Sequence, residues 1–359
     1  MVRSMHEFTD ETAALSDAIQ VLTRQRLEHD QPLDRASSPD ALTERVGVTI
    51  TPEGIGGEEA LRIWAEVLAP STLSTDHPAF LAFVPGAPTK ASVLFDVAIS
   101  ASATYAGTWI EGAGAVWAEN QVLGWLAALA EMPAESGGCF VSGGTAGNLS
   151  ALVAARHAAS IARGGKPATG WRVAVGESAH SSVASAARVM DVELLSMPVD
   201  DGDRLVGEVV GETLAGRDDV FAVVASAGST NAGVIDDLEG IAAACEDARV
   251  WLHVDGAYGG AGLLVPSIRD RFHGLGRADS FIVDPHKWLF APYDACALLY
   301  RDPAMARSAH RQEASYLDSL NVSSEWNPSD FAEPENDDRA RAGDPRPDGL
   351  RHPLRVAKR

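Results

Sequence analysis

The sequence predicts an α/β fold whose central sheet is mainly parallel and flanked by helices. Short apolar runs alternate with stretches of helical periodicity: GCFVSGG, WRVAVGES, VELLSMPV, VFAVVASAG, VWLHVDGA and SFIVDPH. Such alternation is typical of strands joined by crossover helices that cover both faces of a sheet. With 359 residues, 46% of them hydrophobic, the chain can bury such a core without disulfides or metals.

The segment before the sheet is expected to be largely helical. Residues 8–29 have helical periodicity, and Asp10 can cap their start. Residues 30–56 are rich in Pro, Asp, Ser and Gly, so we expect an arm or linker there. A second helix is expected at 57–68, and residues 90–130 have helical periodicity with a break near 107–114.

Composition divides the chain into three expected parts. Residues 1–74 form an N-terminal helical segment, and residues 75–331 form a large α/β domain. Residues 332–359 are expected to be disordered, because this stretch is rich in proline and charge and has no aromatic residue.

Charge and cysteine content restrict the partners. The net charge of −21 disfavours nucleic acids and anionic membranes, which need positive surface. The N-terminus lacks the apolar segment of a secretory signal, and no apolar stretch is long enough to span a bilayer. The three cysteines form no CxxC pair, which fits a reduced compartment. We therefore expect a cytoplasmic protein with a small-molecule partner and no metal site.

Ligands of parallel sheets bind beyond the carboxyl ends of the strands, and polar residues follow several of the predicted strands. Gly144 and Thr145 lie between a strand and a helix, where free N–H groups and the helix dipole favour an anion. A tight turn without a ligand is the alternative. His180 follows the next strand and can stack on a flat ring or titrate. The alternative for His180 is a helix cap or an exposed side chain.

Two later strand ends carry a hydroxyl and a carboxylate. Thr230 lies in a glycine-flanked turn as a possible hydrogen-bond donor, although a turn alone also explains it. Asp255 ends an apolar run, where a carboxylate needs a cationic or N–H partner. Small residues after it, Ala257 among them, leave room for a bulky group. A salt bridge to Lys or Arg is the alternative.

Residues 279–300 predict strand, turn and strand, and they place Lys287 in an apolar run. Burying an ammonium is costly unless it is paired or made neutral. A phosphate cradle, a stacking side chain, an acid for a ring nitrogen and a buried lysine are together the parts of a pyridoxal phosphate site. That cofactor gives the features one common explanation.

The motifs SGGTAGN, AHSS, HVDGAYGG and DPHKW, in this order, resemble the group II pyridoxal-phosphate-dependent amino-acid decarboxylases, which include the aromatic-L-amino-acid and glutamate decarboxylases. The resemblance spans roughly residues 75–330. It implies pyridoxal phosphate fold type I, the aspartate-aminotransferase-like fold. It also implies a homodimer with its active site at the subunit interface.

The resemblance implies roles for the residues that hold the cofactor. Lys287 resembles the lysine that forms the Schiff base with pyridoxal 5'-phosphate, and Asp255 resembles the partner of the pyridine nitrogen. His180 resembles the residue that stacks on the ring. Thr230 matches a hydroxyl near the ring, and Ala257 matches the small residue packed against the ring face.

Four further residues resemble contacts on the phosphate side: Gly144, Thr145, His286 and Asp284. Many relatives have asparagine at the position of Asp284. The carboxylate is therefore a departure from the usual pattern.

The resemblance also implies a reaction, the decarboxylation of an L-amino acid to its amine and CO₂. Tyr316 has the spacing from Lys287 expected of the mobile-loop tyrosine that reprotonates the quinonoid at Cα. A surface loop tyrosine is the alternative. Phe80 and Phe83 lie where the family lines its side-chain pocket, so an aromatic substrate is reasonable.

Two other functions stay open. The family normally continues into a small C-terminal domain, and the resemblance fades after NPSDFA, so we expect a truncated or frame-altered decarboxylase. Such a chain could be a cofactor-binding remnant without catalysis. Another fold-type-I enzyme, such as an aminotransferase, is the third interpretation, and His180 and Tyr316 count against it.

Overall fold

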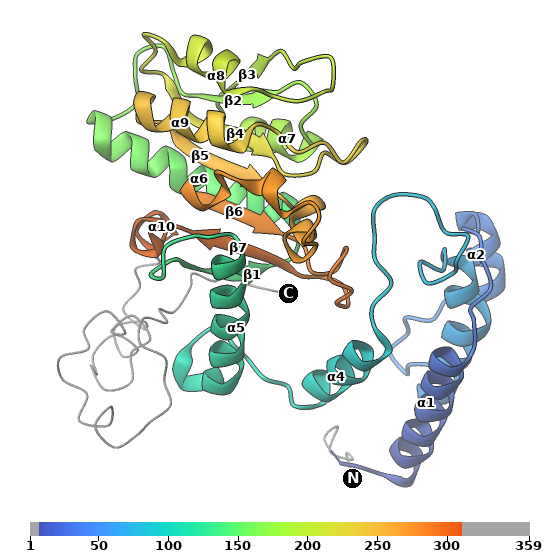
Figure 1. Ribbon diagram of the computed structural model, residues 1–359. Coiled ribbons are helices and arrows are strands. Elements are labelled where there is room, and N and C mark those ends of the chain that lie inside the picture. The colour runs from blue at the N-terminus through green and yellow to red at the C-terminus, as the bar shows by residue number, and fades with distance from the viewer. Residues whose placement is uncertain (1–6, 311–359) are drawn as a thin grey trace. The chain divides into compact units, whose positions relative to one another are not determined.

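The computed structural model describes residues 7–310, which divide into two compact units between Lys90 and Ala91. Figure 1 shows the elements of both units. Tyr316 and the predicted tail at 332–359 lie outside the described residues. The predicted domain boundary at residues 74 and 75 stays a prediction.

The first unit is helical, as expected. Its elements are α1 (Asp10–Glu28), α2 (Pro39–Val46) and α3 (Gly57–Ile63), which continues as a π-helix (Trp64–Leu68) and a 3₁₀ turn (Ala69–Ser71). Thr9 caps α1, because its Oγ1 accepts a hydrogen bond from the Thr12 N–H at 3.2 Å. The predicted cap, Asp10, is instead the first helical residue, where its charge suits the helix dipole.

Helix α2 lies within residues 30–56, which were expected to be an arm or linker. Its start explains the difference. Ser38 Oγ accepts from the Ala41 N–H at 3.2 Å, and Pro39 occupies the first turn, where its missing N–H costs nothing. Local capping thus outweighs the overall composition of the segment.

The second unit carries the predicted sheet. Within the described residues it has seven strands in the order β1-β7-β6-β5-β4-β2-β3. Their bounds are β1 Gly137–Val141, β2 Arg172–Gly176, β3 Glu193–Met197, β4 Val220–Ser226, β5 Trp251–Asp255, β6 Ser280–Val283 and β7 Cys296–Tyr300. The neighbouring strands β6, β5, β4, β2 and β3 run parallel to one another, and β7 runs antiparallel to both β1 and β6. The prediction of a mainly parallel sheet is confirmed.

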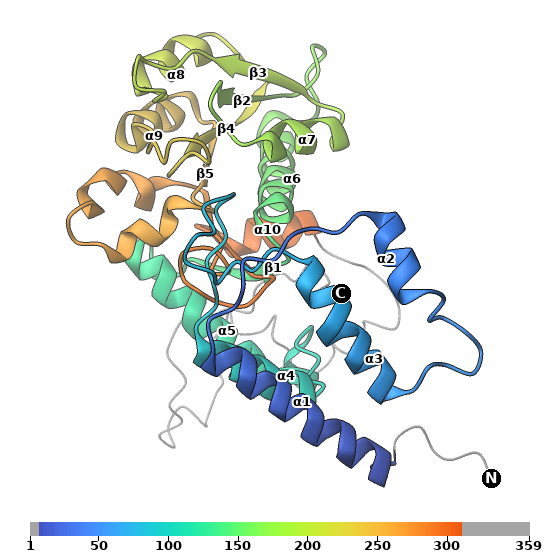
Figure 2. The same ribbon diagram turned by 90° about the vertical axis from the view of Figure 1, so that its right-hand side faces the viewer.

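Helices cover both faces of this sheet. Figure 2 shows α8 and α9 on one face and α6 and α7 on the other. The helices of this unit are α4 Lys90–Ala101, which starts at the unit boundary, α5 Trp109–Leu129, α6 Gly144–Arg163, α7 Ser181–Val189, α8 Gly207–Leu214, α9 Leu238–Ala248 and α10 Pro303–His310, with 3₁₀ turns at Gly259–Leu264, Arg269–Phe272 and Leu275–Arg277. The predicted break near 107–114 is confirmed: α5 starts at Trp109 and Gly112 is not helical.

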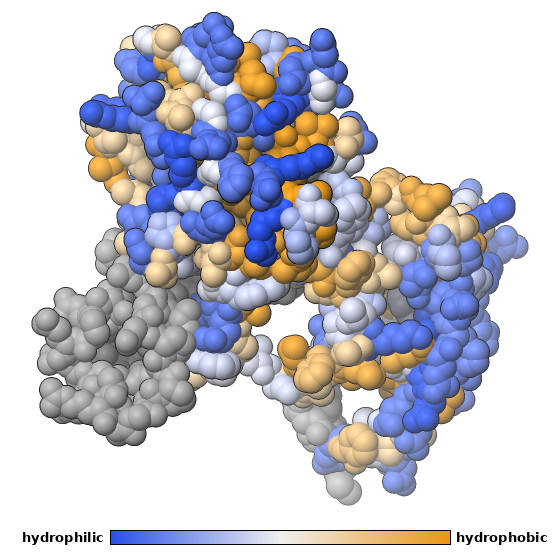
Figure 3. Space-filling model, viewed as in Figure 1, coloured by the Kyte–Doolittle hydropathy of each residue, from blue (hydrophilic) through white to orange (hydrophobic). Residues whose placement is uncertain are grey.

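Helix α4 differs from the other helices of this unit in its apolar exposure. None of its side chains is buried, and Leu94, Phe95, Val97 and Ile99 are each more than half exposed. Figure 3 shows orange, hydrophobic surface in the region of α4.

Within residues 7–310, no helix is both long and apolar enough to cross a bilayer.

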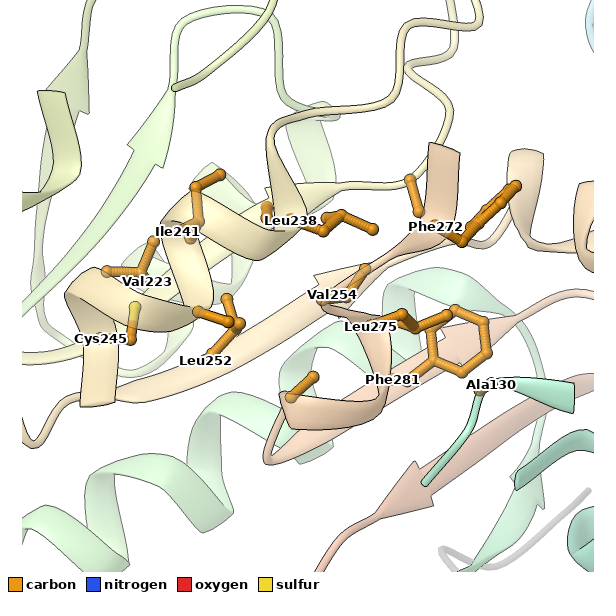
Figure 4. Close-up of a cluster of buried hydrophobic side chains, with 14 of the residues drawn as sticks. Ala130, Val223, Leu238, Ile241, Cys245, Leu252, Val254, Phe272, Leu275 and Phe281 are labelled. Atoms are coloured by element: carbon orange, nitrogen blue, oxygen red, sulfur yellow. The ribbon is translucent and has the colours of Figure 1, made fainter. Parts of the chain in front are cut away.

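Successive side chains of a strand point to opposite faces of the sheet. On β5, Leu252 and Val254 join the buried cluster against α9, drawn in Figure 4. The alternate residues His253 and Asp255 face α6, where both bind Asn148. The apolar face therefore fixes the strand register, and the polar residues of the strand point towards the helix that starts at the glycine-rich turn.

Candidate active site

The second unit contains a cavity of about 630 Å³ at the carboxyl ends of the parallel strands. This volume is within the range of roughly 300–1,000 Å³ that is usual for small-molecule sites. The nine residues predicted to hold the cofactor all line it: Gly144, Thr145, His180, Thr230, Asp255, Ala257, Asp284, His286 and Lys287. Parallel strands end at one edge of the sheet, and this explains why distant segments converge there.

The start of α6 forms an anion-binding end of the cavity. Among the described residues no side chain caps this helix, so its first N–H groups and its dipole are available to a ligand. A Cβ on Gly144 would lie 3.0 Å from the Ala257 Cβ and 3.2 Å from Asp284 Oδ2. Glycine is therefore needed for close approach at this turn.

Lys287 forms an ion pair close to this helix start. Its Nζ lies 2.9 Å from Oδ2 of Asp284, which is 2% exposed. Oδ1 of the same carboxylate is buried and has no hydrogen-bond partner among the described residues. A buried, half-satisfied carboxylate is costly, and Lys287 offsets part of that cost. Asp284 also repels a phosphate, so its negative charge suits the lysine better than the phosphate.

His286 is fixed between two neighbours. Its Nδ1 accepts a hydrogen bond from the Ala295 N–H at 3.0 Å, so a neutral ring carries its proton on Nε2. Nε2 lies 3.6 Å from Asp284 Oδ2, and the ring centroid lies 5.0 Å from that of Tyr293. Burial raises the pKa of the Tyr293 phenol, and the positive charge of Lys287 opposes the rise.

Asp255 is held by two donors. Oδ1 accepts from the Ala257 N–H at 3.0 Å, and Oδ2 accepts from Asn148 Nδ2 at 2.8 Å. Asn148 Nδ2 also donates to Ser182 Oγ at 2.9 Å, and the Asn148 carbonyl oxygen lies 2.8 Å from His253 Nε2. Burial lowers the pKa of His253 to about 4 against the attraction of Asp255, so the ring is neutral near neutral pH.

His180 precedes α7 and acts as its N-cap. Its Nδ1 accepts from the Ser182 N–H at 3.2 Å and lies 2.8 Å from Ser182 Oγ. The predicted alternative of a helix cap is thus correct, and it is compatible with a site role because His180 also lines the cavity. Thr230 and Thr145 line the cavity with exposed side chains.

Three further predicted residues belong to other parts of the chain. Phe80 and Phe83 belong to the first unit, and Tyr316 lies outside the described residues, so their roles stay predictions. The sequence reasoning missed Asn148 and His253. A signal existed for both: Asn148 follows Gly144 by one helical turn, and His253 precedes Asp255 by two strand positions.

The fold and the site define a class of protein. A mainly parallel sheet with a lysine, a carboxylate and an anion-binding helix start at one cavity is typical of fold type I pyridoxal phosphate proteins. The chain belongs to the pyridoxal-dependent decarboxylases, whose conserved-domain model matches residues 58–330. The predicted family, fold class and cofactor are thereby confirmed.

Relatives of known name agree with this assignment. An aromatic-L-amino-acid decarboxylase of Bacillus atrophaeus is 32% identical over 306 residues, which cover 83% of this chain and 63% of the relative. An L-2,4-diaminobutyrate decarboxylase of Rhizobium meliloti is 36% identical over 235 residues, which cover 64% of this chain and 46% of the relative. The chain thus spans between about half and two thirds of these relatives.

Solved structures show the same fold. The chain matches a structure described as Oryza sativa TDC with PLP and tryptamine, with a TM-score of 0.78 and 23% identity, over 90% of this chain and 70% of that one. The glutamate decarboxylase domain of a Vibrio parahaemolyticus protein matches with a TM-score of 0.76 and 25% identity, over 86% and 70% of the two chains.

Proposed function

We propose that this chain decarboxylates an L-amino acid to the amine and CO₂, with pyridoxal phosphate held by Lys287. The observation that carries the proposal is the convergence of Lys287, Asp255 and the α6 start at one cavity. When bound, the cofactor supplies an aldehyde and an electron-withdrawing ring.

The residues present fit this cofactor. The open glycine turn at Gly144 and the uncapped N–H groups of α6 suit a phosphate, with Thr145 as a further donor. Lys287 supplies the amine for covalent attachment.

The side chains around the ring would then have distinct tasks. Asp255 would accept a hydrogen bond from the protonated ring nitrogen, because both of its oxygens are already oriented by N–H donors. His180 would hold the ring face by stacking, and Ala257 would leave space for the ring, since both residues line the cavity. Thr230 donates a hydroxyl hydrogen bond near the ring.

The substrate class and the final protonation rest on Phe80 and Phe83 of the first unit and on Tyr316, which lies outside the described residues. We propose an aromatic substrate on the strength of Phe80 and Phe83, and a relative named as an aromatic-L-amino-acid decarboxylase supports it. The L-2,4-diaminobutyrate relative makes that diamino acid the second substrate to test. We assign Tyr316 as the general acid that delivers a proton to Cα.

The test is CO₂ release from a panel of L-amino acids by the cofactor-loaded chain. We expect release from an aromatic amino acid, none from the Lys287→Ala variant, and a shift from amine towards aldehyde product in Tyr316→Phe. Cofactor binding without CO₂ release from any amino acid would refute decarboxylation. A keto acid formed in place of CO₂ would show transamination instead.

We further propose that the chain works as a homodimer in the cytoplasm. The exposed apolar residues of α4 support a subunit interface, because monomers rarely expose such a patch. The three cysteines are buried thiols that form no disulfide, which supports a reducing compartment. Light scattering should give twice the chain mass. A monomer with Phe95 exposed in solution would contradict the dimer.

A further inference from the structure

A continuous chain of hydrogen bonds runs between α6 and the sheet and ends at the cavity. Trp251 Nε1 donates to Ser280 Oγ at 2.8 Å, and Ser280 Oγ lies 2.8 Å from His253 Nδ1. Beyond His253, the chain passes through Asn148 and there divides. One branch ends at Asp255, and the other passes through Ser182 to His180.

The acceptor chemistry of Asp255 fixes the orientation of the Asn148 side-chain amide. Asp255 accepts through both oxygens, so the Asn148 amide must turn its N–H groups towards this carboxylate. A flipped amide would place its carbonyl oxygen against Oδ2. Both amide hydrogens are therefore used, one for Asp255 and one for Ser182 Oγ.

The orientation of the Asn148 amide determines which ring nitrogen of His253 carries the hydrogen. The Asn148 carbonyl oxygen faces His253 Nε2, so Nε2 carries the hydrogen. Indole N–H only donates, so Ser280 Oγ accepts from Trp251 and gives its own hydrogen to His253 Nδ1. His253 is fully buried, and its neutral Nε2–H form satisfies all of these contacts.

The other branch sets the proton position on His180. Ser182 Oγ accepts from Asn148 and can then donate its hydrogen to His180 Nδ1. The backbone N–H of Ser182 donates to the same nitrogen. Nδ1 therefore has no hydrogen of its own, and Nε2–H is the end that remains for the cavity.

We propose that Asn148 is a positioning residue that orients the Asp255 carboxylate and, through Ser182 Oγ, supports the Nε2–H tautomer of His180 together with the Ser182 backbone N–H. The inference rests on the proposed function, because Asp255 and His180 are the groups assigned to the ring nitrogen and the ring face. A neutral imidazole can stack on a positively charged ring without charge repulsion. The Asn148 side-chain amide thus orients both residues, Asp255 and His180, that are proposed to contact the cofactor ring.

The test uses the full chain, labelled with ¹⁵N at histidine, in the cofactor-free state. Imidazole ¹⁵N shifts report which nitrogen is protonated, and His180→Gln and His253→Gln assign the signals. We expect Nε2–H at both histidines in the wild type. In Asn148→Leu, we expect the His180 signals to shift, because Ser182 Oγ loses its amide donor and no longer has to turn its hydrogen towards Nδ1, while the Ser182 backbone N–H still donates to this nitrogen. Ser150→Ala, two residues further along α6 and outside this chain of bonds, is the matched control and should keep both signals.

Cofactor affinity gives a second readout. Losing a hydrogen bond to a charged group weakens binding roughly tenfold to a hundredfold, so we expect that change in the pyridoxal phosphate dissociation constant for Asn148→Leu. Should this variant fail to fold, Ser182→Ala breaks the branch to His180 alone and should shift the His180 signals while leaving those of His253 unchanged.

Two results would overturn the inference: a His180 that is protonated at Nδ1 in the wild type, or signals in the folded variants that match the wild type. Its failure is separable from failure of the proposed function. A wild type that binds no cofactor refutes the proposed function, whereas the ¹⁵N shifts of the cofactor-free protein decide the tautomers independently.

Discussion

Replacement of His253 by glutamine should make the protein less sensitive to acid. His253 is completely buried, and burial lowers its pKa from 6.5 to about 4. The folded state keeps the ring neutral, whereas the unfolded chain takes up a proton below about pH 6.5. The stability that His253 contributes is therefore present above this pH and is lost as the pH falls towards 4.

The size of the effect follows from linkage. With pKa values of 6.5 unfolded and about 4 folded, the free energy of unfolding falls by about 2 kcal/mol between pH 7 and pH 5 through His253 alone. Glutamine can donate to Asn148 and accept from Ser280 but does not titrate in this range. The variant should lack this loss.

The assay is urea-induced unfolding of both proteins at the two pH values, because urea leaves the ionic strength unchanged. Comparison with the variant cancels the contributions of all other titrating groups. A wild type and a variant whose unfolding free energies fall in parallel would refute the reasoning. That result would mean that His253 takes up its proton in the folded state.

Three further outcomes are expected. Asp284→Asn removes a buried negative charge that pairs with Lys287 and repels the phosphate, so pyridoxal phosphate should bind roughly tenfold more tightly in a spectroscopic titration. The control, Asp294→Asn at an exposed position, should change the affinity little. Weaker binding by Asp284→Asn would contradict this expectation. Phe281→Ala should lower the free energy of unfolding, measured in urea, by about 3–5 kcal/mol, because Phe281 is fully buried. The control Val189→Ala changes an exposed residue and should cost about 0.5 kcal/mol or less. Equal losses for the two variants would disprove the assigned core. All three thiols are buried, so iodoacetamide should add mass after unfolding and not before, and rapid labelling of the folded protein would count against this burial.

Much of the fold could be predicted because its signals are local. Each parallel strand is a short apolar run that ends in polar or small residues, and the period of two on β5 already separates Leu252 from His253. Since parallel strands end at a common edge, Gly144, Asp255 and Lys287 could be brought to one site from their positions in the strand order. The helix α2 was missed because composition was weighed above the cap at Ser38.

The network around Asn148 could not be predicted in the same way. Its partners Ser182, His253 and Asp255 are 34, 105 and 107 residues away, and hydrogen bonds over such separations depend on the packing of α6 against the sheet. A buried asparagine within a helix has no periodic signal of its own. The pairing of Asp284 with Lys287 was missed although the two are three residues apart, because the resemblance suggested a phosphate contact.

The most direct test of the central claim is borohydride reduction of the chain after incubation with pyridoxal phosphate, followed by peptide mass spectrometry. Reduction makes a covalent lysine–cofactor bond permanent. The account predicts one pyridoxyl phosphate adduct, on Lys287, and its loss together with the visible absorption band in Lys287→Ala. An adduct spread over other lysines, or a band that survives in the variant, would contradict the account.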